Sequence, residues 1–179
     1  MEKIKIGSFI VESGNIVCGD TGYTDRVDVE TYSCKNGKYN VYVEIGNYDG
    51  WGKRIAKLIA IHEHDDYDHD TLLWEYNGEM LGVDSGTMGI FDERYWEVYH
   101  YNEINFNTWY DKYICGELDE YLTIDDRCAV SSSGFGDGCY SCDLCYDNDK
   151  VGDYTICAVM ITFIEDEEDD ETWIDKYQA

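Results

Sequence analysis

The sequence predicts a mainly β protein of the α+β class: an antiparallel sheet or sandwich with one or two short helices. Residues 131–164 combine a Gly-rich turn, two strand-like runs and a short polar loop, which is the pattern of a β-hairpin. Residues 39–45 alternate apolar and polar side chains, as a half-buried strand does. Asp92 is a good N-cap for a short helix over 93–100, which has an acid in its first turn.

Short strands and turn residues alternate through the first third of the chain. We expect strands over 4–11 and 15–18, followed by a strand over 25–33. The strand over 39–45 has Tyr, Val, Val and Ile on one face. Residues 54–62 fit a helix or a strand, and their β-branched content favours a strand.

The middle of the chain is less regular. Residues 72–76 and 80–83 flank Asn77–Gly78, a pair typical of tight turns, which predicts a hairpin. A strand over 87–91 precedes the predicted helix. Residues 102–121 fit either a bent helix or a long packed loop.

The last predicted strand, 156–164, is apolar on both faces. A strand of this kind is usually central in its sheet and covered on both sides. We expect one face to carry Ile156, Ala158, Met160, Thr162 and Ile164. Most of the remaining apolar side chains come from Tyr154, Cys157, Val159, Ile161 and Phe163.

Neither an internal repeat nor a linker-like stretch divides the chain. We therefore expect one β-rich domain over 1–164, followed by an acidic helix or tail over 165–179. Residues 1–11 lack the long apolar block of a secretory signal, and the apolar run 156–164 is too short to cross a bilayer. These features predict a soluble cytoplasmic protein whose eight cysteines are reduced.

The negative charge is concentrated in the later part of the chain. The net charge is −26; residues 1–60 hold eight Lys or Arg against eight Asp or Glu, and residues 61–179 hold five against 31. Direct binding to nucleic acid is disfavoured, because it requires cations that displace the counterions of the phosphates. A basic partner would instead be attracted.

Cys139, Cys142 and Cys145 have the spacing of a zinc knuckle. On a strand, however, the first and third of these share a face and the second points to the other. Cys157 on the facing strand could complete a pair, but this geometry does not imply four converging thiolates. Small buried core residues are the simpler interpretation.

His62 and His64 lie in an acidic segment, HEHDDYDHD over 62–70, and would share one face if the preceding strand continued. Imidazole and carboxylate together can hold a divalent metal, although a solvated polar loop also explains the segment. A second candidate cluster consists of four acids at predicted turns, Asp20, Asp84, Asp92 and Asp137.

Three stretches carry a resemblance: GVDSGTMGIFD over 82–92, SSSGFGDGCY over 131–140, and residues 38–64. They resemble an uncharacterised domain family found in phage and bacterial genomes. The resemblance implies a β-rich single domain and a phage-associated origin, and it transfers no catalytic residue. The family's Asp-Pro-Cys-Tyr step reads DTGY over 20–23 here, so its Pro and Cys are missing.

The leading hypothesis from the sequence is a non-enzymatic phage-type inhibitor of the anti-CRISPR or anti-restriction kind. It would act in the host cytoplasm as an acidic mimic of nucleic acid, without cofactor, metal or membrane contact, on a basic host protein that handles nucleic acid. The residues expected to bind this partner are Asp65, Asp66, Asp68, Asp70, Glu117, Asp119, Glu120, Asp125, Asp126, Glu167, Glu168, Asp169 and Asp170.

Two alternatives belong to other classes. A metal-dependent enzyme or a small-ligand-binding domain would use segment 62–70 or the four acids at turns. A structural or self-associating protein would show oligomers without a partner.

Overall fold

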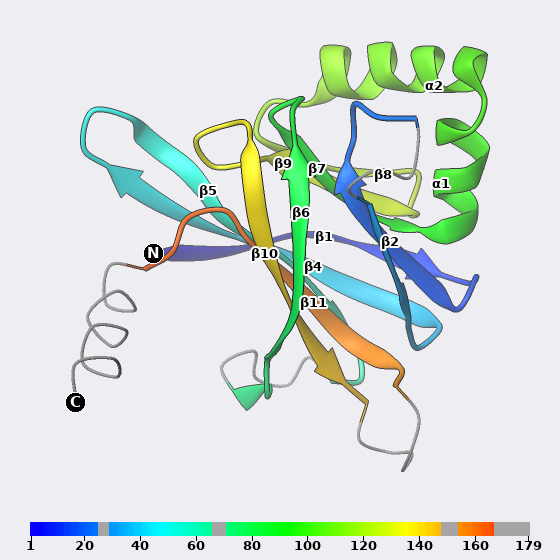
Figure 1. Cartoon of the computed structure of the whole chain (residues 1–179), viewed down its shortest axis with the longest axis horizontal. Helices are drawn as coiled ribbons and strands as arrows, with labels where there is room; N and C mark the ends of the chain where they lie inside the picture. Colours follow the sequence, from blue (N-terminus) through cyan, green and yellow to red (C-terminus); the bar gives the residue numbers. More distant parts are fainter. Residues whose placement is uncertain (25–28, 66–70, 148–153, 167–179) are drawn as a thin grey trace.

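The computed structural model describes residues 1–24, 29–65, 71–147 and 154–166, which form two antiparallel sheets and two short helices extended by a π-helical segment. The six-stranded sheet has the order β1 (Glu2–Val11), β4 (Gly37–Tyr48), β5 (Gly52–His62), β11 (Ile156–Thr162), β10 (Gly138–Tyr146), β6 (Glu75–Val83). The five-stranded sheet has the order β3 (Glu30–Ser33), β2 (Asn15–Asp20), β7 (Thr87–Asp92), β9 (Cys128–Ser132), β8 (Tyr121–Ile124). The predicted mainly β fold is confirmed (Figure 1).

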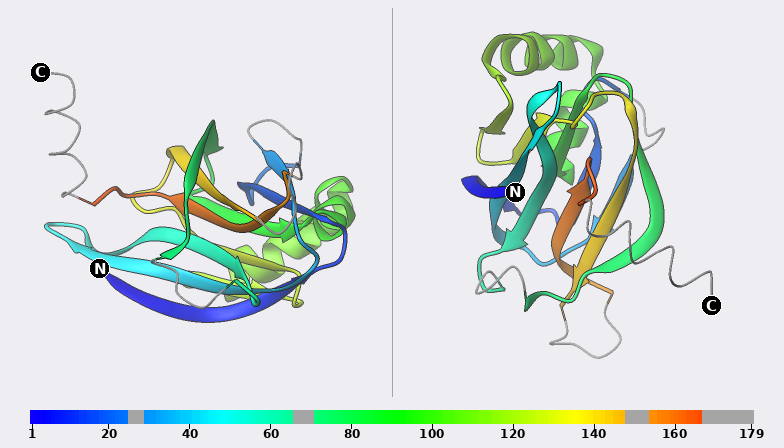
Figure 2. Two further views of the ribbon diagram at one scale, coloured as in Figure 1. Left: turned by 90° about the horizontal axis from the view of Figure 1, so that it is seen from below. Right: turned by 90° about the vertical axis from the view of Figure 1, so that its left-hand side faces the viewer.

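The main core lies between the two sheets. It is built from side chains of both sheets, among them Phe9, Tyr39, Leu81 and Ile90, each fully buried. Two layers are needed because each sheet can bury an apolar face only against another element. The six-stranded sheet curves around the smaller one, as the two views in Figure 2 show.

The helices cover the outer face of the five-stranded sheet. α1 (Glu93–His100) and α2 (Glu103–Trp109) bury Trp96 and Trp109 against Phe91 and Val130 of that sheet. Asp92 caps α1 as predicted, its carboxylate accepting the backbone N–H of Arg94 at 2.9 Å. The region that fitted either a helix or a packed loop is helical, because α2 runs on into η2 (Tyr110–Glu117).

β11 lies between β5 and β10 and is buried almost throughout, so the predicted central strand is confirmed. The predicted assignment of faces is wrong at both ends. Ile164, which follows the strand, packs against the core between the sheets rather than beside Met160. At the start of the strand a bulge is the cause. Cys145 pairs with Ala158, whereas Tyr146 pairs with Ile156, so Cys157 is an extra residue in the ladder. This β-bulge turns Ile156 into the core between the sheets and leaves Cys157 on the outer face beside Ala158.

The predicted hairpin around Asn77–Gly78 is also wrong, because both flanks belong to one edge strand, β6. Met80 pairs with Ser141 and Tyr76 with Asp143, so residues 77–79 bulge opposite a single residue of β10. Gly78 has φ +83°, which a glycine adopts at little cost. The Asn-Gly pair therefore forms a bulge rather than a turn, since pairing with β10 continues on both sides of it.

Candidate functional site

Asp20 ends β2 and is almost completely buried, with 3% of its surface exposed. Its carboxylate accepts backbone N–H groups of Gly22 at 2.7 Å, Asp84 at 2.7 Å and Ser85 at 2.9 Å, and also the Ser85 hydroxyl. A Cβ on Gly22 would lie 2.7 Å from that of Ser85, so the close approach of these two turns requires glycine. Asp20 therefore fastens the β6–β7 turn to the end of β2.

Hydroxyl groups extend this contact to a third loop. Thr21 and Thr87 share a hydrogen bond between their hydroxyls, and the Ser85 hydroxyl lies 2.8 Å from that of Thr87. The backbone N–H of Ser133 donates to the carbonyl of Gly86 at 3.0 Å. Residues 20–23, 84–87 and 131–138, which contain the motifs singled out in the sequence, thus form one hydrogen-bonded unit, here called the three-loop cluster.

Acidic side chains gather on the outside of the three-loop cluster. The Tyr23 hydroxyl donates to the carboxylate of Asp84. This hydrogen bond, together with the negative charges of Asp84, Asp20 and Asp137, raises the pKa of Tyr23 to about 12. Three of the four acids predicted at turns are therefore neighbours.

The fourth acid, Asp92, lies at the other end of β7, where its strand position pairs with Ile16 rather than with Asp20. Its carboxylate caps α1 and accepts the backbone N–H groups of Glu12 and Ser13 at 2.7 and 3.1 Å. It is thus occupied in fixing the β1–β2 turn. Among the described residues, no group of three or more His, Cys, Asp or Glu side chains is placed to hold a metal ion.

A second acidic contact lies where the free edges of the two sheets approach each other. The side chain of Asn77 on β6 donates to the hydroxyl of Tyr32 on β3 at 2.9 Å, so these two edge strands are adjacent. Burial and the neighbouring charge of Glu79 raise the pKa of Glu30. Two carboxylates therefore repel each other across this edge.

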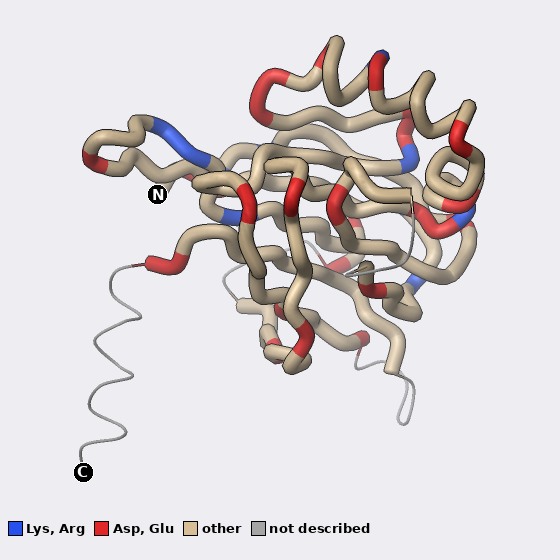
Figure 3. The backbone as a smooth tube through the Cα atoms, turned by 45° about the horizontal axis from the view of Figure 1, so that its top comes forward, with Lys and Arg blue, Asp and Glu red and all other residues tan. Residues whose placement is uncertain are grey.

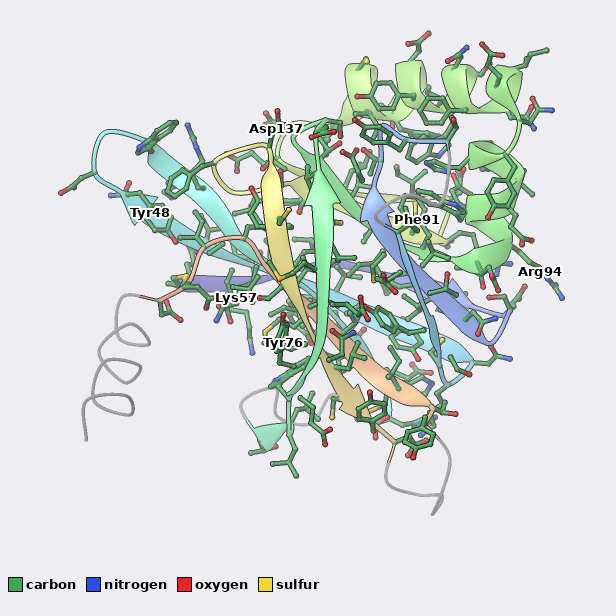
Figure 4. The ribbon with its side chains drawn as sticks, viewed as in Figure 1. Tyr48, Lys57, Tyr76, Phe91, Arg94 and Asp137 are labelled. Atoms are coloured by element: carbon green, nitrogen blue, oxygen red, sulfur yellow. The ribbon has the colours of Figure 1, made fainter. Side chains whose placement is uncertain are left out.

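Large side chains beside these acids are exposed. Tyr76 and Met80 on β6 are 58% and 46% exposed, and the Tyr76 hydroxyl contacts the Met80 sulfur at 3.5 Å. Tyr76 lies on the lower part of β6, and Asp137 lies at the upper end of the adjacent β10 (Figure 4). We call the surface formed by Tyr23, Glu30, Tyr76, Glu79, Met80, Asp84 and Asp137 the acidic edge face.

The elements that form this face carry no cation. Residues 6–24, 29–34, 71–93 and 128–147 contain neither Lys nor Arg. Figure 3 shows red and no blue along the front strands, whereas the β4–β5 hairpin at the left carries blue. Lys53 and Arg54 lie at the start of β5, in that hairpin. The charges are thus segregated within the fold, and a cationic partner meets no like charge on these elements.

The sequence-predicted partner residues that the structure describes lie at more than one place in the fold. Asp65 follows β5 and lies 3.6 Å from the ammonium of Lys35. Glu117, Asp119 and Glu120 precede β8, whereas Asp125 and Asp126 follow it. The Asp125 carboxylate accepts the hydroxyls of Tyr95 and Tyr113 at 2.7 and 3.0 Å. The remaining predicted residues lie outside the described residues: Asp66, Asp68, Asp70, Glu167, Glu168, Asp169 and Asp170.

His62 and His64 do not share an exposed face. His62 ends β5 and is 2% exposed, with its Nε2 at 3.0 Å from the carbonyl oxygen of Asn36. Its Nδ1 accepts the backbone N–H of His64 at 3.3 Å. Both ring nitrogens of His62 thus contact the backbone, so the ring braces the end of β5. Residues 66–70 lie outside the described residues.

The cysteines of β10 point to alternate sides, as the sequence predicts. Cys142 lies in the core between the sheets, Cys145 packs on the outer face of the six-stranded sheet, and Cys139 is exposed. A zinc site built from these three thiolates is therefore excluded by the direction of the side chains.

Two open hollows are lined by residues outside the three-loop cluster. One, of about 540 Å³, lies beside Tyr48 and Lys53 and includes Glu165 and Asp166. The other, of about 420 Å³, lies between α1 and the β8–β9 turn. Both mix acidic and basic side chains, so neither extends the acidic edge face.

Comparison with protein-family models, with curated proteins and with solved structures gave no match for this chain. Within the described residues, no helix has the length and apolar character needed to span a membrane.

Proposed function

We propose that this chain is a binding protein whose acidic edge face binds a positively charged surface of another protein. The observation that carries the proposal is the gathering of Glu30, Glu79, Asp84 and Asp137 on elements without Lys or Arg. Like charges held this close destabilise the fold through repulsion, so their retention favours a role in contact with cations.

The exposed aromatic and sulfur-containing side chains fit the same role. Tyr76, Met80 and Tyr23 are of the types that are enriched at protein interfaces, where they bury apolar surface. Carboxylates around such anchors accelerate the encounter with a cationic partner and select against anionic ones. The face thus combines long-range attraction with short-range packing.

The partner that this chemistry fits best is a basic protein that handles nucleic acid. Its cationic cleft holds phosphates in its ordinary function, and a run of carboxylates can take their place. The chain would then act as an inhibitor of such a host protein, as its resemblance to phage sequences also suggests. Inhibition follows because one cleft cannot hold both the chain and a polynucleotide.

Affinity capture tests the proposal. The immobilised chain is exposed to a bacterial lysate at low salt, and bound proteins are eluted with rising salt and identified. We expect a basic nucleic-acid-binding protein that elutes as the salt rises and is displaced by duplex DNA. Capture of acidic or neutral proteins alone, or retention that is indifferent to salt and DNA, refutes it.

A variant of the chain tests the acids that the sequence predicts to bind the partner. Asp119→Asn combined with Asp126→Asn neutralises one residue on each side of β8. Weaker capture by this variant would extend the interface to β8, and unchanged capture would confine it to the acidic edge face.

A further inference from the structure

Two cysteines of adjacent strands are brought together by the bulge in β11. Cys145 on β10 pairs with Ala158, and the two side chains share the outer face of the six-stranded sheet. In an unbroken ladder Cys157 would point to the opposite face, into the core. Because the bulge inserts Cys157 as an extra residue, its side chain lies on the same face as Cys145.

The two side chains are in contact. The Cys157 thiol donates to the carbonyl oxygen of Cys145 at 3.5 Å, and its interaction with the Cys145 thiol is the largest influence on the pKa of both groups. Ile59, Ile61 and Ala158 pack around the pair, which is 6% exposed at Cys145 and 3% exposed at Cys157. The packing holds both sulfurs in place, and Cys145 keeps a small opening to solvent.

The contact also makes the two thiols chemically unequal. The hydrogen bond from Cys157, supported by the backbone N–H of Leu73, lowers the pKa of Cys145. The same hydrogen bond, together with burial, raises the pKa of Cys157. The thiolate, which is the nucleophilic form, is therefore favoured at Cys145.

We propose that Cys145 and Cys157 are an oxidative modification site, at which a peroxide converts the two thiols into a disulfide between β10 and β11. The Cys145 thiolate attacks one peroxide oxygen, the O–O bond breaks, and the leaving hydroxide takes a proton to become water. Cys145 is then a sulfenic acid. The Cys157 sulfur attacks the Cys145 sulfur, the S–O bond breaks, and a second water leaves. The peroxide is reduced and the two thiols are oxidised.

The other cysteines provide internal comparisons. Cys18 and Cys142 also contact each other, but both are fully buried between the sheets, and burial raises the pKa of Cys18 well above its usual value. Cys139 is exposed on the same strand as Cys145 and on the same face. Oxidation governed by exposure alone would select Cys139 and Cys115, which are both exposed, whereas oxidation governed by the paired geometry selects Cys145 and Cys157.

Peptide mapping distinguishes these outcomes. The folded full-length chain is treated with hydrogen peroxide, its free thiols are alkylated, and it is digested with trypsin without reduction. A disulfide between Cys145 and Cys157 joins fragments 128–150 and 151–176, since Lys150 lies between the two cysteines. A disulfide between Cys18 and Cys142 would join fragment 128–150 to fragment 6–26 instead.

We expect the 128–150/151–176 product in the wild type and equally in Cys139→Ser, and its loss in Cys145→Ser and Cys157→Ser. In Cys157→Ser, Cys145 should remain as a sulfenic acid that dimedone labels. The proposal is overturned if the folded wild type lacks this product while Cys139 is oxidised, or if the product persists in Cys145→Ser. If a variant folds poorly, fragmentation of the wild-type product shows which cysteines of 128–150 are alkylated, and Cys145 should be the one that is not.

Discussion

Asp20 accepts a 2.7 Å hydrogen bond from the backbone N–H of Asp84, and this contact ties the end of β2 to the turn that leaves β6. The two strands belong to different sheets, so the contact joins the two layers of the fold at one end. Because Asp20 is buried and Asp84 is exposed, the two aspartates have different roles. Asp20 holds the loops, and Asp84 belongs to the surface that they present.

Replacing Asp20 should therefore destabilise the protein much more than replacing Asp84. Asp20→Ala leaves three partly buried backbone N–H groups and a serine hydroxyl without their acceptor. We expect the free energy of unfolding in urea to fall by about 3 kcal/mol, against about 0.5 kcal/mol or less for Asp84→Ala. Equal losses in the two variants would show that Asp20 does not fasten the loops.

The titration of Tyr23 should depend on Asp84. The hydrogen bond to Asp84 is the largest cause of the raised pKa of Tyr23, about 12 against an ordinary value of 10.0. Asp84→Asn removes the negative charge, so the pKa should move down toward 10.0. NMR titration of ¹³C-labelled tyrosine, assigned with Tyr23→Phe, measures it. An unchanged Tyr23 titration in this variant would mean that the two residues are not coupled.

His100 should make the protein less stable in mild acid. Its ring is fully buried and stacked on Trp96, and burial lowers its pKa from 6.5 to about 4. Between pH 6.5 and 4, His100 is therefore protonated in the unfolded chain but neutral in the folded chain. The free energy of unfolding decreases as the pH falls through this range. This contribution amounts to about 3 kcal/mol.

His100→Phe keeps a ring against Trp96 and removes the titrating group. We expect the variant's free energy of unfolding to fall less than that of the wild type between pH 6.5 and 4, in urea titrations at matched salt. The carboxylates contribute equally to both proteins, so they cancel in the difference. Parallel pH profiles would contradict the assignment to His100.

The bulge in β6 gives a test of local backbone strain. Gly78 has φ +83°, and no atom lies within 4 Å of the point that a Cβ would occupy, so an added methyl group meets only the conformational penalty. Gly78→Ala should lower the free energy of unfolding by about 1 kcal/mol in urea titration. A neutral or stabilising effect would show that β6 tolerates another conformation at this point.

Local patterns were sufficient for most of the fold. The alternation over 39–45 corresponds to β4, the N-cap at Asp92 begins α1, and the two-sided apolar run from 156 is the central β11. The two errors inside strands are both bulges, at Asn77–Gly78 and at Cys157. In each case the neighbouring strand fixes the ladder on both sides of the extra residues, and that pairing cannot be read from the segment alone.

The candidate site was less predictable for the same reason. Turn positions suggested a cluster that includes Asp20, Asp84 and Asp137, and these three are close to Tyr23. The proximity of Glu30 and Glu79, however, depends on how the edges of two different sheets meet. One signal in the sequence was available: the absence of Lys and Arg from every strand that forms this edge.

The most direct test of the central claim is the affinity for the captured partner as a function of salt. One variant combines Glu30→Gln, Glu79→Gln, Asp84→Asn and Asp137→Asn. A control variant, which loses the same amount of negative charge, combines Glu2→Gln, Glu97→Gln, Glu103→Gln and Asp111→Asn. The account predicts that the first variant binds about tenfold more weakly or worse and with a smaller salt dependence, while the control binds nearly as the wild type does. The account is contradicted if both variants lose affinity for the partner equally, or if neither variant loses affinity.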